Sequence, residues 1–215
     1  MKKIIATLLI AAGAYSYANA QGLVEVYNIG GGNANYTNNA ISIFNGGTSS
    51  GGTSVLAPST AGGFYYALLT ATFGGAAPSA NPTSSSWSLA LMATNYLVAG
   101  GIRAAGGAAG TAVAGWAGGQ TDYFELVGWS ASLGTTWSQV EGEIASGNFI
   151  ANGSLGVSPV ASLTAASAPS PATSIFGGTG LSSGITMYTV TVPEPASMAL
   201  VALGGASLLL FRRKK

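Results

Sequence analysis

The glutamates Glu141 and Glu143 are the side chains of this 215-residue chain whose type and spacing come closest to a known catalytic arrangement. Residues two positions apart in a β-strand project from the same face. Glycosidases use two carboxyl groups about 5 to 9.5 Å apart, and same-face neighbours in a strand fall in that range. The stronger interpretation is that the pair provides solvating charge on an exposed strand. Glycoside hydrolysis through Glu141 or Glu143 is therefore an alternative, and we predict that the chain is not an enzyme.

Other catalytic and metal chemistry is restricted by composition, because the sequence contains neither histidine nor cysteine. Nucleophilic sites of the Ser-His-Asp or Cys-His type are excluded, as is zinc bound by Cys or His. Asp122 and Glu125 could help to bind calcium together with backbone carbonyls, but no Asp-rich loop accompanies them. The glycine-rich residues 100–119 lack the Lys-Ser/Thr pair of a phosphate-binding loop. We therefore expect no metal and no cofactor.

Four tryptophans offer flat apolar faces on which sugar rings could stack. They are Trp87, Trp116, Trp129 and Trp137. Large rings are also needed to fill the core of a chain so rich in glycine and alanine. Core packing is the favoured interpretation for each of them, and contact with a glycan is the alternative.

The charged residues are distributed unevenly along the chain. Six of the seven lysines and arginines occupy the two ends. Between residues 21 and 193, Arg103 stands against five carboxylates, so one positive and five negative charges give a formal net charge of −4. This part of the chain has no basic patch, which argues against nucleic-acid binding.

The elements that would position these side chains are short strands. Apolar and β-branched runs between Gly-, Pro- and Asn-rich turns predict strands over residues 23–29, 40–44, 64–73, 87–92, 111–116, 123–129, 136–143 and 185–192. The rest of residues 100–119 and the Pro-, Ser- and Thr-containing residues 158–180 are expected to form loops. The fold class that this pattern favours is all-β, an antiparallel, jelly-roll-like β-sandwich over residues 21–192.

Residues 1–20 have the features of a secretory signal peptide. Lys2 and Lys3 precede an apolar run of 11 residues, and Ala18 and Ala20 supply the small residues at −3 and −1 of a cleavage site. We predict that signal peptidase cleaves after Ala20 and that the following residues are exported.

The opposite end combines an extended tripeptide with an apolar segment and a basic terminus. Residues 196–211 carry no charge and, as a helix, would span roughly 24 Å. This is short for a membrane span, but a small mismatch is tolerated. The terminus should remain cytoplasmic as a stop-transfer cluster. That cluster is Arg212, Arg213, Lys214 and Lys215, and the tripeptide before the helix is Pro193-Glu194-Pro195.

This tail resembles the PEP-CTERM sorting signal over residues 193–215. The resemblance implies a transient inner-membrane anchor, processing by exosortase, and delivery to the cell surface or extracellular matrix of an exopolysaccharide-producing bacterium. The bodies of such proteins vary widely, so the tail indicates a destination and not an activity. We expect a structural or adhesive protein of that matrix. The alternative is a carbohydrate-binding module of the same matrix, with exopolysaccharide as its partner.

Overall fold

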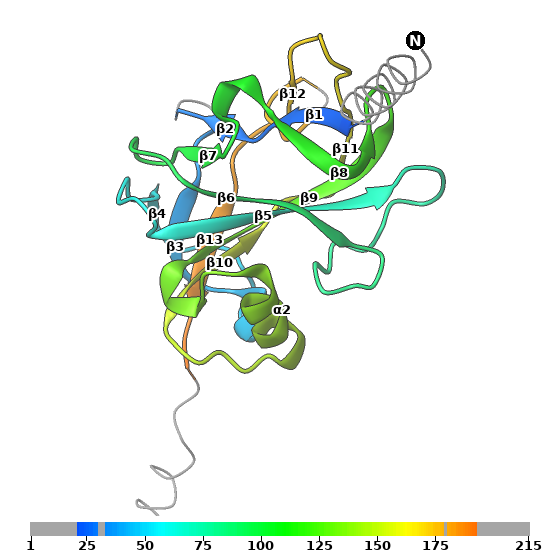
Figure 1. Ribbon diagram of the computed structural model, residues 1–215. Coiled ribbons are helices and arrows are strands. Elements are labelled where there is room, and N and C mark those ends of the chain that lie inside the picture. Colours follow the sequence, from blue (N-terminus) through cyan, green and yellow to red (C-terminus); the bar gives the residue numbers. More distant parts are fainter. Residues whose placement is uncertain (1–20, 30–32, 179, 193–215) are drawn as a thin grey trace, which may run out of the picture.

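The computed structural model of the protein describes residues 21–29, 33–178 and 180–192 (Figure 1). The predicted signal peptide at residues 1–20 and the predicted tail at residues 193–215, with its apolar helix at 196–211, lie outside these residues. Within the described ranges, no helix has both the length and the apolarity that a membrane crossing requires.

Short strands make up most of the described chain, as the sequence predicts. The strands are β1 (Gln21–Glu25), β2 (Tyr27–Asn28), β3 (Tyr36–Ile41), β4 (Ser54–Leu56), β5 (Phe64–Thr72), β6 (Ser88–Asn95), β7 (Ile102–Ala104), β8 (Thr111–Ala117), β9 (Thr121–Ser130), β10 (Gly153–Val157), β11 (Ala161–Thr164), β12 (Thr173–Ser174) and β13 (Thr186–Val190). The helices are α2 (Trp137–Ser146) and the 3-10 turns η2 (Ile43–Asn45), η3 (Gly107–Ala109) and η4 (Ala131–Leu133).

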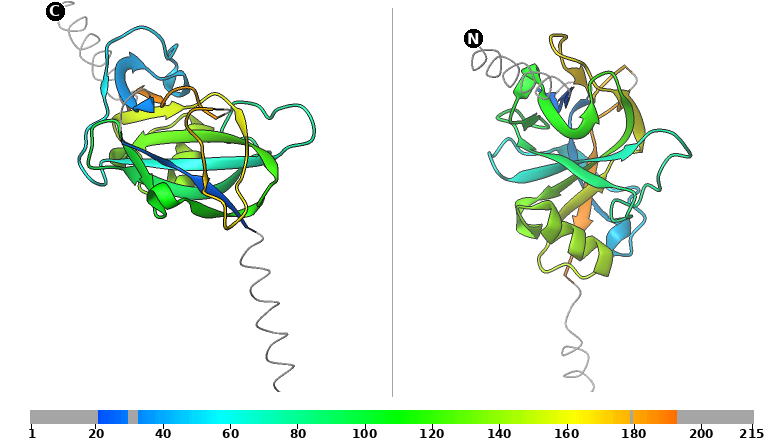
Figure 2. Two further views of the ribbon diagram at one scale, coloured as in Figure 1. Left: turned by 90° about the horizontal axis from the view of Figure 1, so that it is seen from above. Right: turned by 45° about the vertical axis from the view of Figure 1, so that its right-hand side comes forward.

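The strands form one large curled sheet and one small sheet. The large sheet has the order β2-β7-β6-β5-β9-β10-β13-β3-β4, with β11 added to β9, and the small sheet has the order β12-β1-β8. Most pairs are antiparallel, but β13–β3 and β1–β12 are parallel. The small sheet lies on one side of the large sheet and α2 lies on the other (Figures 1 and 2). The predicted β-rich class is confirmed, whereas a simple antiparallel sandwich of jelly-roll type is not.

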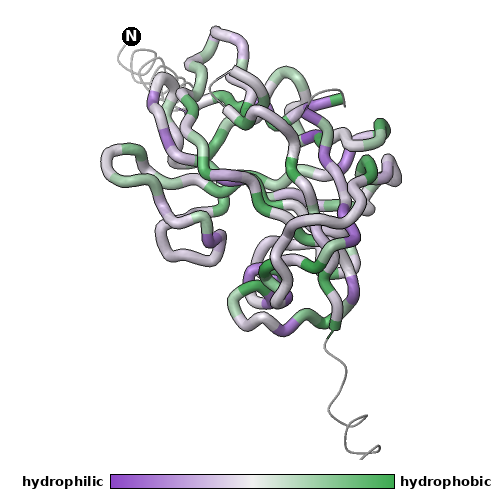
Figure 3. The backbone as a smooth tube through the Cα atoms, turned by 180° about the vertical axis from the view of Figure 1, so that it is seen from behind, coloured by the Kyte–Doolittle hydropathy of each residue, from purple (hydrophilic) through white to green (hydrophobic). Residues whose placement is uncertain are grey.

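Two hydrophobic clusters bury opposite faces of the large sheet. The first joins its inner face to the small sheet and includes Tyr66, Leu126 and Trp116. The second lies under α2 and includes Val127, Trp129 and others. Because β9 is covered on both faces, its residues from Phe124 to Trp129 are all buried. Strongly hydrophilic segments are few and scattered along the chain (Figure 3).

Buried asparagines close the curl of the large sheet. Asn35, with no exposed surface, donates from its side chain to the Gly100 carbonyl at 3.2 Å and accepts from the Ile185 amide at 3.0 Å. Its backbone N–H also donates to the Gly100 carbonyl, at 2.9 Å. The loop between β6 and β7 is thereby joined to the starts of β3 and β13. Asn95 similarly accepts from the Phe64 amide at 3.1 Å.

The long apolar runs form strands close to where the sequence predicts them. The runs at 64–73, 123–129 and 185–192 correspond to β5, β9 and β13, and the run at 111–116 corresponds to β8. Glycines permit close packing inside these strands. A Cβ at Gly128 would lie 2.5 Å from Ile185 Cδ1 and 2.8 Å from the Tyr66 ring. Gly128 thus lets the two flanking side chains meet over β9.

The strand predicted over residues 136–143 is wrong, because this segment is helix α2. The capping-box pair Thr136 and Gln139 begins the helix, and Gln139 Oε1 accepts a hydrogen bond from the Thr136 amide at 3.2 Å. Trp137, Val140 and Ile144 then recur at helical spacing and are buried. Gly147 ends the helix in the left-handed conformation, at φ 67°.

Three further segments differ from the predicted secondary structure. The predicted strand at 40–44 begins earlier, as β3, and ends in η2. The expected loops at 100–119 and 158–180 contain β7 and the strands β11 and β12. These strands are too short to give a clear pattern in the sequence.

Candidate functional site

Glu141 and Glu143 do not form the same-face pair that the sequence predicts. Positions two apart on an α-helix are about 200° apart around its axis. Glu141 is half-buried, whereas Glu143 is only 7% exposed and its Oε2 has no hydrogen-bond partner. Burial raises the pKa of Glu143, and a hydrogen bond from the Ile150 backbone opposes the shift. The geometric basis for a glycosidase pair is therefore lost.

Asp122 and Glu125 also lie apart, because three residues along a strand place side chains on opposite faces. Asp122 accepts hydrogen bonds from the Phe73 amide at 3.2 Å and from Gln120 Nε2 at 3.0 Å. Glu125 lies opposite Leu69 in the β5–β9 ladder. The two carboxylates do not converge on a calcium ion. In the described ranges, no cluster of three or more acidic residues is suitable for a metal.

Glu125 is buried in an apolar environment. Its side chain has no exposed surface, and neither carboxylate oxygen has a hydrogen-bond partner. Desolvation raises its pKa to about 8. The sequence could have indicated this, because Glu125 interrupts an apolar run between Phe124 and Leu126.

All four tryptophans lie in the core, with exposed fractions of at most 8%. Three of them donate their indole N–H to backbone carbonyls: Trp87 to Ser79 at 2.9 Å, Trp116 to Gln120 at 2.9 Å, and Trp129 to Gly134 at 2.8 Å. The core-packing interpretation describes these three residues. As they lie, none presents a face for a sugar ring.

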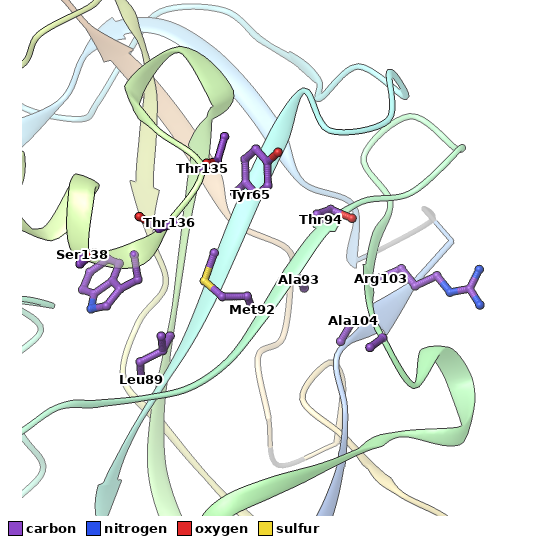
Figure 4. Close-up of a pocket in the computed structure, with 12 residues that line it drawn as sticks. Tyr65, Leu89, Met92, Ala93, Thr94, Arg103, Ala104, Thr135, Thr136 and Ser138 are labelled. Atoms are coloured by element: carbon purple, nitrogen blue, oxygen red, sulfur yellow. The ribbon is translucent and has the colours of Figure 1, made fainter.

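Trp137 differs from the other three tryptophans because it lines a hollow on the surface (Figure 4). The hollow has a volume of about 720 Å³ and lies between the β5–β6–β7 part of the large sheet and the start of α2. Its apolar lining includes Tyr65, Leu89 and Met92. Hydroxyls border it, from Thr94, Thr135, Thr136 and Ser138.

The buried Trp129 ring packs against two of the rings that line this hollow. Trp129 stacks on Tyr65, with ring centroids 6.4 Å apart, and contacts Trp137, with centroids 6.0 Å apart. Both pocket rings are thus held by a fully buried neighbour. Arg103 also lines the hollow, but its guanidinium points away from Met92 and lies over the Tyr96 ring, 5.4 Å from the centroid. The sequence does not single out Tyr65 and Met92, because a strand pattern does not show which residues border a hollow.

The end of the described chain is held by two asparagine side chains. Asn45 accepts from the Thr191 amide at 2.9 Å and donates to the Thr191 carbonyl at 3.1 Å. Asn152 accepts from the Val192 amide at 2.8 Å. The chain is therefore fixed to the fold as far as the residue before Pro193. No feature of the sequence singles out these asparagines, since both lie in turn-like segments.

Comparison with known proteins identifies the tail that begins at this point. A family model described as the PEP-CTERM protein-sorting motif matches residues 191–214. No curated protein and no solved structure matches the chain.

The chain therefore contains a motif that implies export. It carries the PEP-CTERM protein-sorting motif, as the sequence resemblance predicts, and the motif implies exosortase processing and delivery to the cell surface. The match begins two residues before Pro193, so its first residues are Thr191 and Val192, which the asparagines hold.

Proposed function

We propose that this protein is a structural or adhesive component of the extracellular matrix and has no catalytic activity of its own. The observation that carries the proposal is the sorting motif at residues 191–214, which implies delivery to the cell surface. Signal peptidase would remove residues 1–20, and exosortase would process the tail at the inner membrane. The exported part would then act by contact, within or beside exopolysaccharide.

The described residues support a contact role because their acidic groups are dispersed. Glu141 and Glu143 lie on different sides of α2, and Glu125 is enclosed by apolar side chains. Low charge also leaves little electrostatic repulsion between copies or between the protein and a polymer.

Loss of the chain should weaken the matrix, and this is measurable in the producing bacterium. A strain without the protein is expected to release exopolysaccharide from its cells under shear more readily than the parent strain. The wild-type chain should restore retention. A chain with Pro193, Glu194 and Pro195 changed to alanine should not, because it would lack the sorting signal. Equal retention in all four strains would contradict a structural role.

The hollow beside Trp137 favours a second function, the binding of neutral saccharides. The half-buried Tyr65 ring provides a stacking surface beside Trp137, which is only 6% exposed, and the bordering threonine and serine hydroxyls can bond to sugar hydroxyls. Among the residues that the structure describes, no carboxylate lines the hollow. A volume of about 720 Å³ is within the range of small-ligand sites.

Saccharide binding at this hollow predicts a specific loss in Leu89→Ala and Tyr65→Ala. Each truncation removes apolar surface from the lining, so affinity for neutral oligosaccharides in a glycan array or by calorimetry should fall at least about tenfold. Leu97→Ala is the matched control, because Leu97 is 72% exposed and is not part of the lining. Binding that is equally strong in all variants would place the ligand elsewhere.

A further inference from the structure

We infer that Asn45 and Asn152 form a clamp that fixes the boundary of processing, so that the peptide bond broken during sorting lies after Val192. This rests on the exosortase processing that the motif implies. The released protein would keep Thr191 and Val192 on its surface, bound to the two asparagines.

The clamp begins where the last strand leaves the core. Val190 has no exposed surface, whereas Val192 is 40% exposed. The β13 ladder to β10 ends with Gly153 opposite Val190. Thr191 and Val192 therefore do not pair with β10. Their backbone amides instead donate to the side chains of Asn45 and Asn152.

The two asparagines of the clamp come from opposite sides of β13. Asn45 is the last residue of η2, which follows β3, the parallel neighbour of β13. The Ser42 amide donates to the Thr189 carbonyl at 2.8 Å, and this places η2 beside Thr191. Asn152 directly precedes β10, on the other side of β13. Its carbonyl accepts from Ser132 Oγ at 2.8 Å, so its backbone is itself held.

The bonds of Asn45 reproduce the pairing of a β-ladder. The side-chain oxygen accepts from the Thr191 amide and the side-chain nitrogen donates to the Thr191 carbonyl, as a neighbouring strand would. The Thr191 hydroxyl also donates to the same Asn45 oxygen, at 3.0 Å. These contacts use mainly backbone atoms of Thr191 and Val192, so they hold the position and direction of these two residues.

A held segment is a poor substrate for an enzyme that must bind an extended chain. A protease reaches such a segment only when it opens locally, and the cleavage rate then follows the open population. Cleavage breaks one peptide bond, whose acyl group passes to water or to an amine acceptor while the tail leaves with a free amino group. With the clamp closed, bonds up to Val192 are protected.

Limited proteolysis of the full-length chain in mild detergent tests the clamp. With a broad-specificity protease, wild-type fragments should end at or after Val192, as read from intact mass. The double variant Asn45→Ala/Asn152→Ala should gain ends between Val190 and Val192, at a rate at least about tenfold higher. Asn148→Ala is the matched control, since Asn148 is exposed and its side chain makes no bond to the tail.

Further measurements separate the clamp from general destabilisation and from the proposed function. Asn45→Asp keeps the oxygen acceptor but loses the donor, so it should give an intermediate rate at an unchanged melting temperature. Wild-type fragments that end before Val192 as often as those of the double variant would overturn the clamp. In cells, a released protein that ends before Val192 would also overturn it, whereas absence of any release would contradict the processing itself.

Discussion

Replacement of Glu125 by leucine is expected to stabilise the protein, by roughly 3 kcal/mol at pH 7. Burial raises the pKa of Glu125 from 4.5 to about 8, so the folded protein retains a proton that the unfolded chain releases. Between these two values, stability falls as the pH rises, by about 1.4 kcal/mol per unit from this group. Below pH 4.5 both states are protonated and the effect disappears. Leucine removes the free-energy cost of burying the Glu125 carboxyl group and adds an apolar side chain opposite Leu69.

Urea unfolding of the full-length chain in mild detergent between pH 4 and 9 measures this effect. The wild type should lose stability from about pH 4.5 to about pH 8, and Glu125→Leu should remove most of that slope. Glu141→Gln is the control for the loss of a half-buried carboxylate on α2, and it should not give the gain in stability at pH 7 that Glu125→Leu gives. A Glu125→Leu protein that is less stable than the wild type at pH 8 would show that the carboxyl has a favourable partner.

Asn35→Ala is expected to lower the free energy of unfolding by about 3 kcal/mol. The substitution leaves the Ile185 amide without its side-chain acceptor in a fully buried position. It also removes the side-chain bond to the Gly100 carbonyl, so the loop between β6 and β7 is held less firmly to β3. A buried amide without a partner costs more than the loss of an exposed hydrogen bond.

The same unfolding measurement tests Asn35, with Asn148→Ala as the exposed control that should change stability by no more than about 0.5 kcal/mol. Hydrogen exchange should locate the effect. Amides at Ile102 and Ile185 should exchange faster in Asn35→Ala, whereas those in the centre of β9 should change less. A loss below about 1 kcal/mol would mean that Asn35 does not close the sheet.

The sequence predicts the long central strands because their apolar runs are continuous and bounded by turn residues. The runs that became β5 and β9 are buried on both faces, and this produces an uninterrupted pattern of large side chains. Short pairings such as β1 with β12 join residues about 150 positions apart, Val24 with Thr173. No local pattern encodes such a pairing, so the small sheet could not be predicted.

Helix α2 could have been recognised, although its apolar residues are few. Thr136 and Gln139 have the spacing of a capping box, and Trp137, Val140 and Ile144 have helical spacing. A strand fits the same segment only if the apolar residues alternate, which they do not. Because this segment is a helix, the side chains of Glu141 and Glu143 project from different sides of it.

The polar residues that hold the fold together are the part that sequence reasoning missed. Asn35, Asn45 and Asn152 lie in segments typical of turns, where asparagine usually bonds locally. In the structure, these three side chains bond to residues that are distant in the sequence: Asn35 to Gly100 and Ile185, Asn45 to Thr191, and Asn152 to Val192. Their role depends on which distant backbone atoms the fold brings near.

We expect that the chain is exported, sorted by its PEP-CTERM motif and released. Intact mass spectrometry of the protein recovered from a producing bacterium, combined with cell fractionation, tests it most directly. The expected result is a matrix species that lacks residues 1–20 and the terminal basic residues and retains residues up to Val192. A species that still carries Arg212 to Lys215 in the inner membrane, with none in the matrix, would contradict it.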